Sequence, residues 1–233
     1  MSGPSDRFDV PDLFPSVVAV VATTGPSRAP LHPDEEAFIA GAIERRQVDF
    51  ATGRACARAA LGQLGVPPSS IGRGPSREPI WPDGICGSIT HCERFWAAAV
   101  APRAAVRSLG LDAESRRALS PAVLRRIALP EEQRWLDAAG RDLPWDVLLF
   151  SAKESVYKAW FPIMRTWLGF EDVFVRFDAA RRTFQVDVRI AAPEGLDPGA
   201  FHGRFHADET RVITGVVVPL DRKSTRLNSS HVS

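Results

Sequence analysis

The segment GLDAE contains the acidic residues best placed to do chemistry. Asp112 and Glu114 are two positions apart in this segment. On a strand, side chains at i and i+2 point to the same face, so the two carboxylates are predicted to project together. Two carboxylate oxygens, with room for phosphate and water, suit Mg²⁺. Acidic pairs at strand ends are also common on solvated surfaces, so the segment alone does not establish a metal site.

A second segment, FSAKESVYKAW over 150–160, adds basic groups. Helical spacing predicts Lys153 beside Tyr157, and Glu154 beside Lys158. The ordinary explanation for the second pair is a surface ion pair worth about 0.2–0.5 kcal/mol. Lysine usage argues for a functional role, because the chain has only three lysines among its 29 Lys and Arg residues. The single tyrosine of the chain lies in the same segment. Two lysines within six residues therefore predict a need for an ammonium group.

A series of basic and polar residues precedes both segments. Arg46 and Arg54 are eight residues apart on a predicted helix, about 80° around its axis, so both serve one surface. Arg73 lies in the glycine-rich loop IGRGPSR, and Thr90 and His91 end the predicted strand of GSITHC. Arginine guanidinium groups suit terminal phosphates. The alternatives are a solvated helix face and an ordinary hydrogen-bonded histidine.

Hydrophobic patterning predicts the elements that must position these residues. Helix 144–160 is expected to stop at Pro162. Each half of the chain runs strand, helices, strands, so we predict an α+β fold of two similar halves, 1–105 and 106–219, with a seam at 101–105. The predicted helices are 33–64, 120–128, 130–139 and 144–160, and the predicted strands are 17–22, 79–81, 86–91, 95–100, 106–114, 170–177, 183–190, 201–206 and 211–218.

Composition excludes several classes of protein. The net charge of +1 argues against a globally basic nucleic-acid binder. No run of about 18 apolar residues occurs, so no membrane span is expected, and the first residues lack the apolar stretch of a secretory signal. Three cysteines without a CxxC pair predict reduced thiols and a cytoplasmic location. The segment DRKSTRLNSSHVS resembles translated cloning sequence, so 220–233 is expected to be a non-native disordered tail or, alternatively, an ordinary one.

Taken in their order along the chain, the basic series, GLDAE and FSAKESVYKAW resemble the Sfp-type 4′-phosphopantetheinyl transferases over roughly residues 35–177. The family pattern G-[IV]-D-x-E is met except at Leu111, and [FW]-[SCT]-x-K-E-x-x-x-K is met in full over 150–158. GSITHC and WFPIMRTWLGFED resemble the bacterial subgroup that includes the enterobactin-type and actinobacterial enzymes. The resemblance implies a pseudo-twofold pair of α+β halves with the active site in the cleft between them.

The resemblance also implies the reaction and the roles of residues. The phosphopantetheine arm of coenzyme A would pass to a serine of an apo acyl or peptidyl carrier protein, and adenosine 3′,5′-bisphosphate would leave. Mg²⁺, or alternatively Mn²⁺, would be held by Asp112, Glu114 and Glu154, with the backbone of Ala113 close by. Asp112, Glu154 and Lys158 would be catalytic, with Glu154 as general base and Lys158 stabilising phosphate charge. Coenzyme A would be bound by Arg46, Arg54, Arg73, Gly74, Pro75, Ser76, Thr90, His91, Asp112, Glu154, Lys158 and Trp167.

Two other functions stay open at this point. One is a Mg²⁺-dependent hydrolase of nucleotide diphosphates that uses the same acids. The other is a non-catalytic coenzyme A-binding protein, against which the joint presence of Asp112, Glu114, Glu154 and Lys158 argues. A monomer without nucleic-acid or membrane partners is expected. Fatty-acid, polyketide, nonribosomal-peptide and siderophore carrier proteins all fit the predicted reaction.

Overall fold

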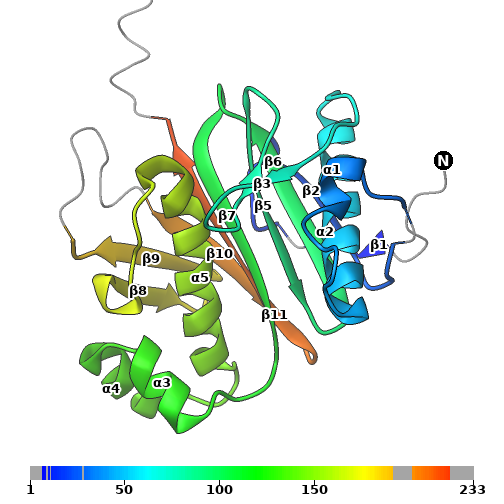
Figure 1. Ribbon diagram of the computed structural model, residues 1–233. Coiled ribbons are helices and arrows are strands. Elements are labelled where there is room, and N and C mark those ends of the chain that lie inside the picture. The colour runs from blue at the N-terminus through cyan, green and yellow to red at the C-terminus, as the bar shows by residue number, and fades with distance from the viewer. Residues whose placement is uncertain (1–6, 9, 11, 28, 191–200, 221–233) are drawn as a thin grey trace, which may run out of the picture.

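The structure is a computed structural model that describes residues 7–8, 10, 12–27, 29–190 and 201–220 (Figure 1). Apart from Leu220, the predicted tail lies outside the described residues. Helices and antiparallel sheets make up the fold, so the predicted α+β class is confirmed. None of the helices in the described part of the chain is long and apolar enough to cross a membrane.

The first half is a four-stranded antiparallel sheet with one long helix packed on it. The strand order is β1-β2-β6-β5, and a separate small ribbon of β3 and β4 follows the helix in sequence. Alanines and Cys56 of the helix pack on small apolar side chains of β6, which lets helix and sheet approach closely. The elements are β1 (Arg7–Phe8), β2 (Ala19–Thr23), α1 (Pro33–Glu36), α2 (Glu44–Gln63), β3 (Gly72–Arg73), β4 (Pro79–Ile80), β5 (Ile85–Cys92) and β6 (Phe95–Pro102).

The second half is a five-stranded antiparallel sheet, in the order β7-β11-β10-β9-β8, with the long helix α5 against β7 and β11. Its apolar core includes Trp145 and Trp160 of α5 and Phe184 and Phe205 of the sheet. The elements are β7 (Val106–Ser115), α3 (Pro121–Ile127), α4 (Pro130–Ala138), α5 (Trp145–Met164), the 3₁₀ turn Phe170–Asp172, β8 (Val173–Asp178), β9 (Thr183–Val188), β10 (His202–Ala207) and β11 (Arg211–Pro219).

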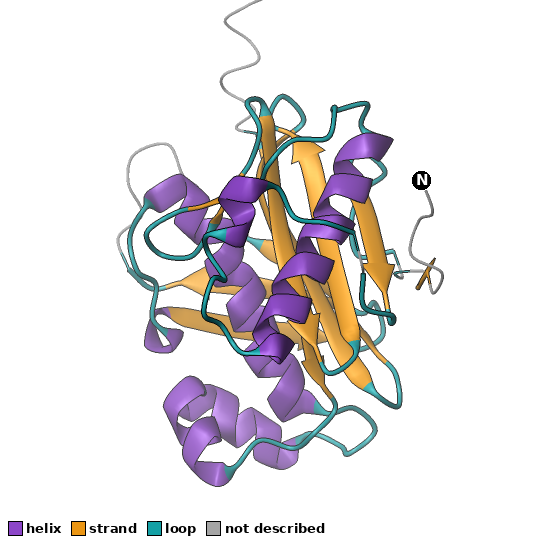
Figure 2. Ribbon diagram, turned by 45° about the vertical axis from the view of Figure 1, so that its right-hand side comes forward, coloured by secondary structure: helices purple, strands orange, loops and turns teal. Residues whose placement is uncertain are grey.

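The two sheets meet where β5 lies beside β7, as Figures 1 and 2 show. Side-chain hydrogen bonds from β5, and not a backbone hydrogen-bond ladder, join the two strands there. The Ser88 hydroxyl donates to the Leu111 carbonyl over 3.3 Å, and the Ala113 N–H donates to Thr90 Oγ1 over 3.0 Å. The predicted seam at 101–105 lies at the turn between β6 and β7, so one tight connection carries the chain from one sheet to the other.

Two predicted helix boundaries are wrong. The predicted helix 33–64 is interrupted between α1 and α2, where Gly41 has a φ of +106°, a backbone conformation that no helix can contain. Pro162 lies inside α5 instead of ending it. Proline removes one N–H donor from the helix, and the buried face of α5, including Trp160, offsets that loss. The helix ends at Met164, and the next residue, Arg165, caps it with a φ of +53°.

Gly110 determines how closely α5 approaches β7. A Cβ atom built at Gly110 would lie 1.9 Å from the Ser155 carbonyl oxygen and 2.9 Å from the Ala159 nitrogen. Both atoms belong to the backbone of α5, so no side-chain rotation can relieve the overlap. The close approach therefore requires glycine at this position.

We expect Gly110→Ala to lower the free energy of unfolding by about 3 kcal/mol or more, because helix and strand must separate to admit one methyl group. Gly62→Ala in α2 is the matched control. A Cβ at Gly62 meets nothing within 4 Å, so helix propensity should raise stability by about 0.5–1 kcal/mol. Urea unfolding of both variants measures the difference. Equal stability of the two variants would contradict the packing constraint.

Candidate active site

Four of the residues singled out from sequence meet where β7 packs on α5. Asp112 and Glu114 lie on β7, and Glu154 and Lys158 lie one helical turn apart on α5. Lys158 Nζ lies 2.7 Å from Asp112 Oδ1 and also donates to the Leu111 carbonyl over 3.2 Å. Asp112 is only 3% exposed, whereas the Lys158 side chain is 28% exposed. The ammonium group therefore joins a buried carboxylate to a solvent-accessible space.

Hydroxyl groups from three elements complete the surroundings of Asp112. Ser151 Oγ of α5 donates to Asp112 Oδ2 over 2.8 Å, and Thr90 Oγ1 of β5 lies 3.4 Å from Oδ1. Thr214 of β11 is the register partner of Asp112 and lies 2.9 Å from Ser151 Oγ. Sequence analysis missed Ser151 and Thr214. Ser151 belongs to the second motif and was detectable there, whereas Thr214 is identified only by strand register.

The two glutamates carry charge that nearby cations do not fully balance. Burial, followed by the carboxylates of Asp112 and Glu154, raises the pKa of Glu114 to about 7 against the opposing effect of Lys158. Burial and then Asp112 also raise the pKa of Glu154, with Lys158 again opposing. Three carboxylates thus share one ammonium group. Hard oxygen donors with excess negative charge suit a divalent cation.

In the described part of the chain, no group of three or more acidic, histidine or cysteine side chains is arranged to hold a metal ion unaided. Ala113, also predicted at the metal, has its N–H bonded to Thr90 Oγ1. A cation at the carboxylates would accordingly need further ligands from water or a bound phosphate. This behaviour is typical of Mg²⁺, which keeps several non-protein ligands.

The first lysine of the motif, Lys153, has different partners from the predicted ones. Lys153 does not pair with Tyr157 but is fully buried on another face of α5. Its ammonium group donates to Glu132 Oε2 over 2.7 Å, the Ile127 carbonyl over 2.8 Å and the Phe170 carbonyl over 2.9 Å. All three N–H bonds are therefore used in holding α3, α4 and the 3₁₀ turn to α5. Of the two lysines, only Lys158 contacts Asp112.

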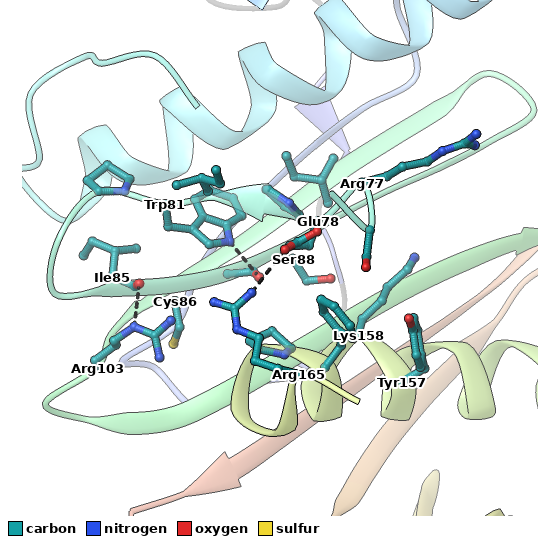
Figure 3. Close-up of a pocket in the computed structure, with 18 of the residues that line it drawn as sticks. Arg77, Glu78, Trp81, Ile85, Cys86, Ser88, Arg103, Tyr157, Lys158 and Arg165 are labelled. Atoms are coloured by element: carbon teal, nitrogen blue, oxygen red, sulfur yellow. Dashed lines mark hydrogen bonds and ion pairs between the residues drawn. The ribbon is translucent and has the colours of Figure 1, made fainter. Parts of the chain in front are cut away.

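A cavity of about 550 Å³ lies between α5, β5 and the loop that leads into β5 (Figure 3). Glu154, Tyr157 and Lys158 line it from α5, Trp81 lines it from the loop, and Glu78 lines it from the turn before β4. The Trp81 indole donates to the Gly87 carbonyl over 3.0 Å, which fixes the ring against β5. Glu78 and Arg165 form a 3.1 Å ion pair from opposite sides of the cavity. The aromatic wall was not predicted.

A smaller cavity of about 120 Å³ gathers the predicted phosphate-binding residues. Arg46, Arg54, Arg73 and His91 all line it. Arg77, Pro79 and Ile89 line both cavities, so the two spaces adjoin. Helix α2, ribbon β3–β4 and strand β5 together place four residues, widely separated in sequence, around one small space.

Arg54 has structural contacts in addition to its place in this cavity. Its Nε donates to the Ile71 carbonyl over 3.1 Å and its Nη2 to the Gly72 carbonyl over 3.2 Å, and its guanidinium lies 4.3 Å from the centre of the Phe50 ring. Burial, together with nearby arginines, lowers the pKa of Arg54 to about 10, while Glu35 opposes the shift. Arg54 therefore holds the start of β3, and the more exposed Arg46 is freer to meet a ligand.

The remaining predicted residues lie around the larger cavity or outside it. Gly74 is buried in the turn before β4, where its N–H donates to the Glu78 carbonyl over 2.8 Å. Ser76 lines the larger cavity, and Pro75 is exposed. Trp167 is 72% exposed, with its ring centre 5.0 Å from that of Tyr157, and is not among the residues that line the cavity.

Two family models match this chain, and they divide it at the β6–β7 turn. Residues 34–101 match the 4′-phosphopantetheinyl transferase N-terminal domain, and residues 108–210 match the 4′-phosphopantetheinyl transferase superfamily. The chain therefore belongs to the 4′-phosphopantetheinyl transferase superfamily. The predicted enzyme class, transfer of the phosphopantetheine arm from coenzyme A to carrier proteins, is confirmed.

Individual relatives place the chain near actinobacterial members of this class. It is 47% identical to the 4′-phosphopantetheinyl transferase Npt of Nocardia iowensis, over 79% of this chain and 88% of the relative. It is 45% identical to Svp of Streptomyces mobaraensis, over 81% and 78%. It is 41% identical to PptT of Mycobacterium tuberculosis, over 83% and 88%. The resemblance read from the motifs is thus confirmed over most of the chain.

Because its pKa is raised, the ionised form of Glu114 should destabilise the folded protein when no cation is bound. Its pKa is about 7 when folded and 4.5 ordinarily, so folding favours the protonated form. The stabilisation that comes from keeping Glu114 protonated in the folded state is complete below pH 4.5 and is lost as pH rises through 7. We expect Glu114→Gln, which mimics the protonated form, to raise the melting temperature in metal-free buffer at pH 8 but to change it little at pH 5. Calorimetry at both pH values measures this, and a lower melting temperature at pH 8 would contradict it.

Proposed function

We propose that the protein transfers the 4′-phosphopantetheine arm of coenzyme A to a serine of an apo acyl or peptidyl carrier protein in a Mg²⁺-dependent reaction that releases adenosine 3′,5′-bisphosphate. The observation that carries this proposal is the position of Glu154 and Lys158 at the wall of a cavity that adjoins a second one lined by arginines. Lys158 pairs there with the buried Asp112, and Glu114 interacts electrostatically with all three. Each half supplies one part: arginines from the first and carboxylates from the second.

The two adjoining cavities suit the two ends of coenzyme A. The arginine-lined cavity suits the 3′-phosphate, since guanidinium groups form charge-assisted hydrogen bonds to phosphate oxygens. The larger cavity, at about 550 Å³ and partly aromatic, has the size and character of a small-molecule site and suits the pantetheine arm. Their junction lies at Arg77 and Pro79, so the pyrophosphate would lie between the cavities, near Lys158.

Asp112, Glu114 and Glu154 would hold Mg²⁺, with Mn²⁺ as an expected substitute. The fit rests on the donor set: three carboxylates, two with raised pKa values, and one ammonium group to offset them. When bound, such a cation neutralises pyrophosphate charge and orients the attack. Without it, Lys158 supplies the nearest positive charge to Asp112.

Glu154 would act as the proton acceptor of the reaction, and Lys158 would stabilise the negative charge that develops. Glu154 would accept the proton of the carrier serine, directly or through water, and its raised pKa suits a general base near neutral pH. The serine oxygen would then form a bond to the phosphorus that carries the pantetheine arm. The bond from that phosphorus to the bridging oxygen would break, leaving charge on the adenosine bisphosphate. Lys158 would stabilise that charge.

Mass spectrometry of a carrier protein separates this proposal from the two alternatives. Purified protein, coenzyme A, Mg²⁺ and a panel of apo carrier proteins should give a carrier protein heavier by one phosphopantetheine group. A hydrolase would release phosphopantetheine into solution and leave every carrier protein unmodified. A protein that only binds coenzyme A would consume none of it.

The setting of the reaction follows from the same proposal. A cytoplasmic location, where coenzyme A and carrier domains occur together, stays a prediction, as does a monomer that acts without nucleic acid. All three cysteines in the described residues are free thiols, which is compatible with a reducing compartment.

Glu154→Gln should reduce transfer by at least 100-fold while the melting temperature stays the same or rises. The amide keeps the shape of the side chain but cannot accept the proton or offer charge to a cation. Glu36→Gln, an exposed substitution in α1, is the control and should behave as wild type. Transfer measured by carrier mass, beside circular dichroism, tests this. Near-normal turnover in folded Glu154→Gln would remove Glu154 from its role.

Arg46→Ala should weaken coenzyme A binding about ten- to 100-fold, because a charge-assisted contact contributes about 1.5–3 kcal/mol. Dephospho-coenzyme A lacks the 3′-phosphate and should bind wild type and Arg46→Ala nearly equally. Arg45→Ala is the matched control, since the neighbouring Arg45 is exposed on α2 and does not line the small cavity. Calorimetric titration with both coenzymes measures the effect. Equal losses on both would show that Arg46 does not bind the 3′-phosphate.

A further inference from the structure

Asp112 has a different set of partners on each carboxylate oxygen. Oδ1 faces Lys158 at 2.7 Å and Thr90 at 3.4 Å, toward the junction of β5 and β7. Oδ2 accepts from Ser151 of α5 over 2.8 Å, and Ser151 also contacts Thr214 of β11. A carboxylate held from both sides cannot rotate its plane without losing a charge-assisted hydrogen bond. Ser151 therefore controls the orientation of the oxygen that meets Lys158.

The available hydroxyl hydrogens favour donation from the Ser151 hydroxyl to Asp112 Oδ2. Thr214 Oγ1 lies 2.9 Å from both Ser151 Oγ and the Ser151 carbonyl. Whichever of these the Thr214 hydrogen occupies, the Ser151 hydrogen can go to Asp112. Asp112 is the only charged acceptor in this trio, and an ionised acceptor forms the stronger bond. Ser151 and Thr214 are fully buried, so water does not compete.

We infer that Ser151 is a positioning residue for the transfer reaction: it holds the plane of the Asp112 carboxylate so that Oδ1 faces Lys158 and the reacting groups. Ser151 itself touches neither cavity. The inference rests on the proposed function, because it assigns Asp112 the task of binding the cation and aligning Lys158. Partners one step removed from a metal ligand commonly change metal affinity or activity 10- to 100-fold when removed.

Ser151→Ala tests the inference cleanly. The Thr214 hydroxyl can still donate to the carbonyl of residue 151, so the substitution leaves no buried donor without a partner in this trio. Ser155→Ala is the matched control. Ser155 is equally buried on the same helix, but its hydroxyl donates locally to the Ala152 carbonyl over 2.8 Å.

Three quantities distinguish positioning from a general loss of stability: kcat, the KM for coenzyme A, and the Kd for Mn²⁺ measured by calorimetry without substrate. For Ser151→Ala we expect kcat to fall and the Kd to rise, each by about ten-fold or more, with KM for coenzyme A within two-fold of wild type. Ser155→Ala should match wild type in all three. Ser151→Thr keeps the hydroxyl and should recover most of the loss; Ser151→Cys, a weaker donor of similar shape, should be intermediate.

The inference is overturned if folded Ser151→Ala, or Ser151→Cys where the alanine variant folds poorly, stays within two-fold of wild type in both kcat and Mn²⁺ affinity. It is overturned equally if Ser155→Ala loses as much as Ser151→Ala. Failure of the proposed function has a separate signature, because wild type would then modify no carrier protein whatever the variants do.

Discussion

The close contact between β7 and α5 at Gly110 is the constraint on which the site depends. With no side chain at Gly110, the backbone of α5 approaches β7 closely enough for Lys158 to reach Asp112 over 2.7 Å. The same approach places the Glu154 carboxylate where it helps to raise the pKa of Glu114. A Cβ atom at this position would push α5 away from β7 and so increase the distance that Lys158 must span. Packing geometry, more than any single hydrogen bond, therefore assembles the charged cluster.

The two lysines of α5 show how one helix uses the same functional group in two ways. Lys153 is fully buried, and Glu132 and two carbonyls accept all three of its N–H bonds, so its charge is satisfied within the protein. Removing one partner of such a buried pair is strongly destabilising. Lys158 keeps 28% of its side-chain surface exposed and faces more carboxylates than it can neutralise. The first lysine stabilises the fold, and the second leaves charge available for a substrate.

The arrangement of charge between the halves suits a substrate with two separated phosphate groups. The first half presents arginines in a small cavity, and the second half presents Glu154 and Lys158 at a larger one. Strand β5 belongs to the first sheet yet contributes Thr90 to the surroundings of Asp112. The interface between the halves is thus part of the candidate site. The proposed positioning by Ser151 extends that site into the core of the second half.

The sequence by itself determined the α+β class and most strands, and it singled out Asp112, Glu114, Glu154 and Lys158 as candidates, because these depend on local periodicity and short motifs. Tertiary structure decided what local patterns do not contain. It turned Lys153 toward Glu132, committed two donors of Arg54 to backbone carbonyls, and brought in Ser151 and Thr214 through packing and strand register. It also interrupted the first predicted helix and continued α5 beyond Pro162. The physical reason is that a motif specifies which groups are present, whereas their partners come from segments distant in the chain, which only packing brings within hydrogen-bonding distance.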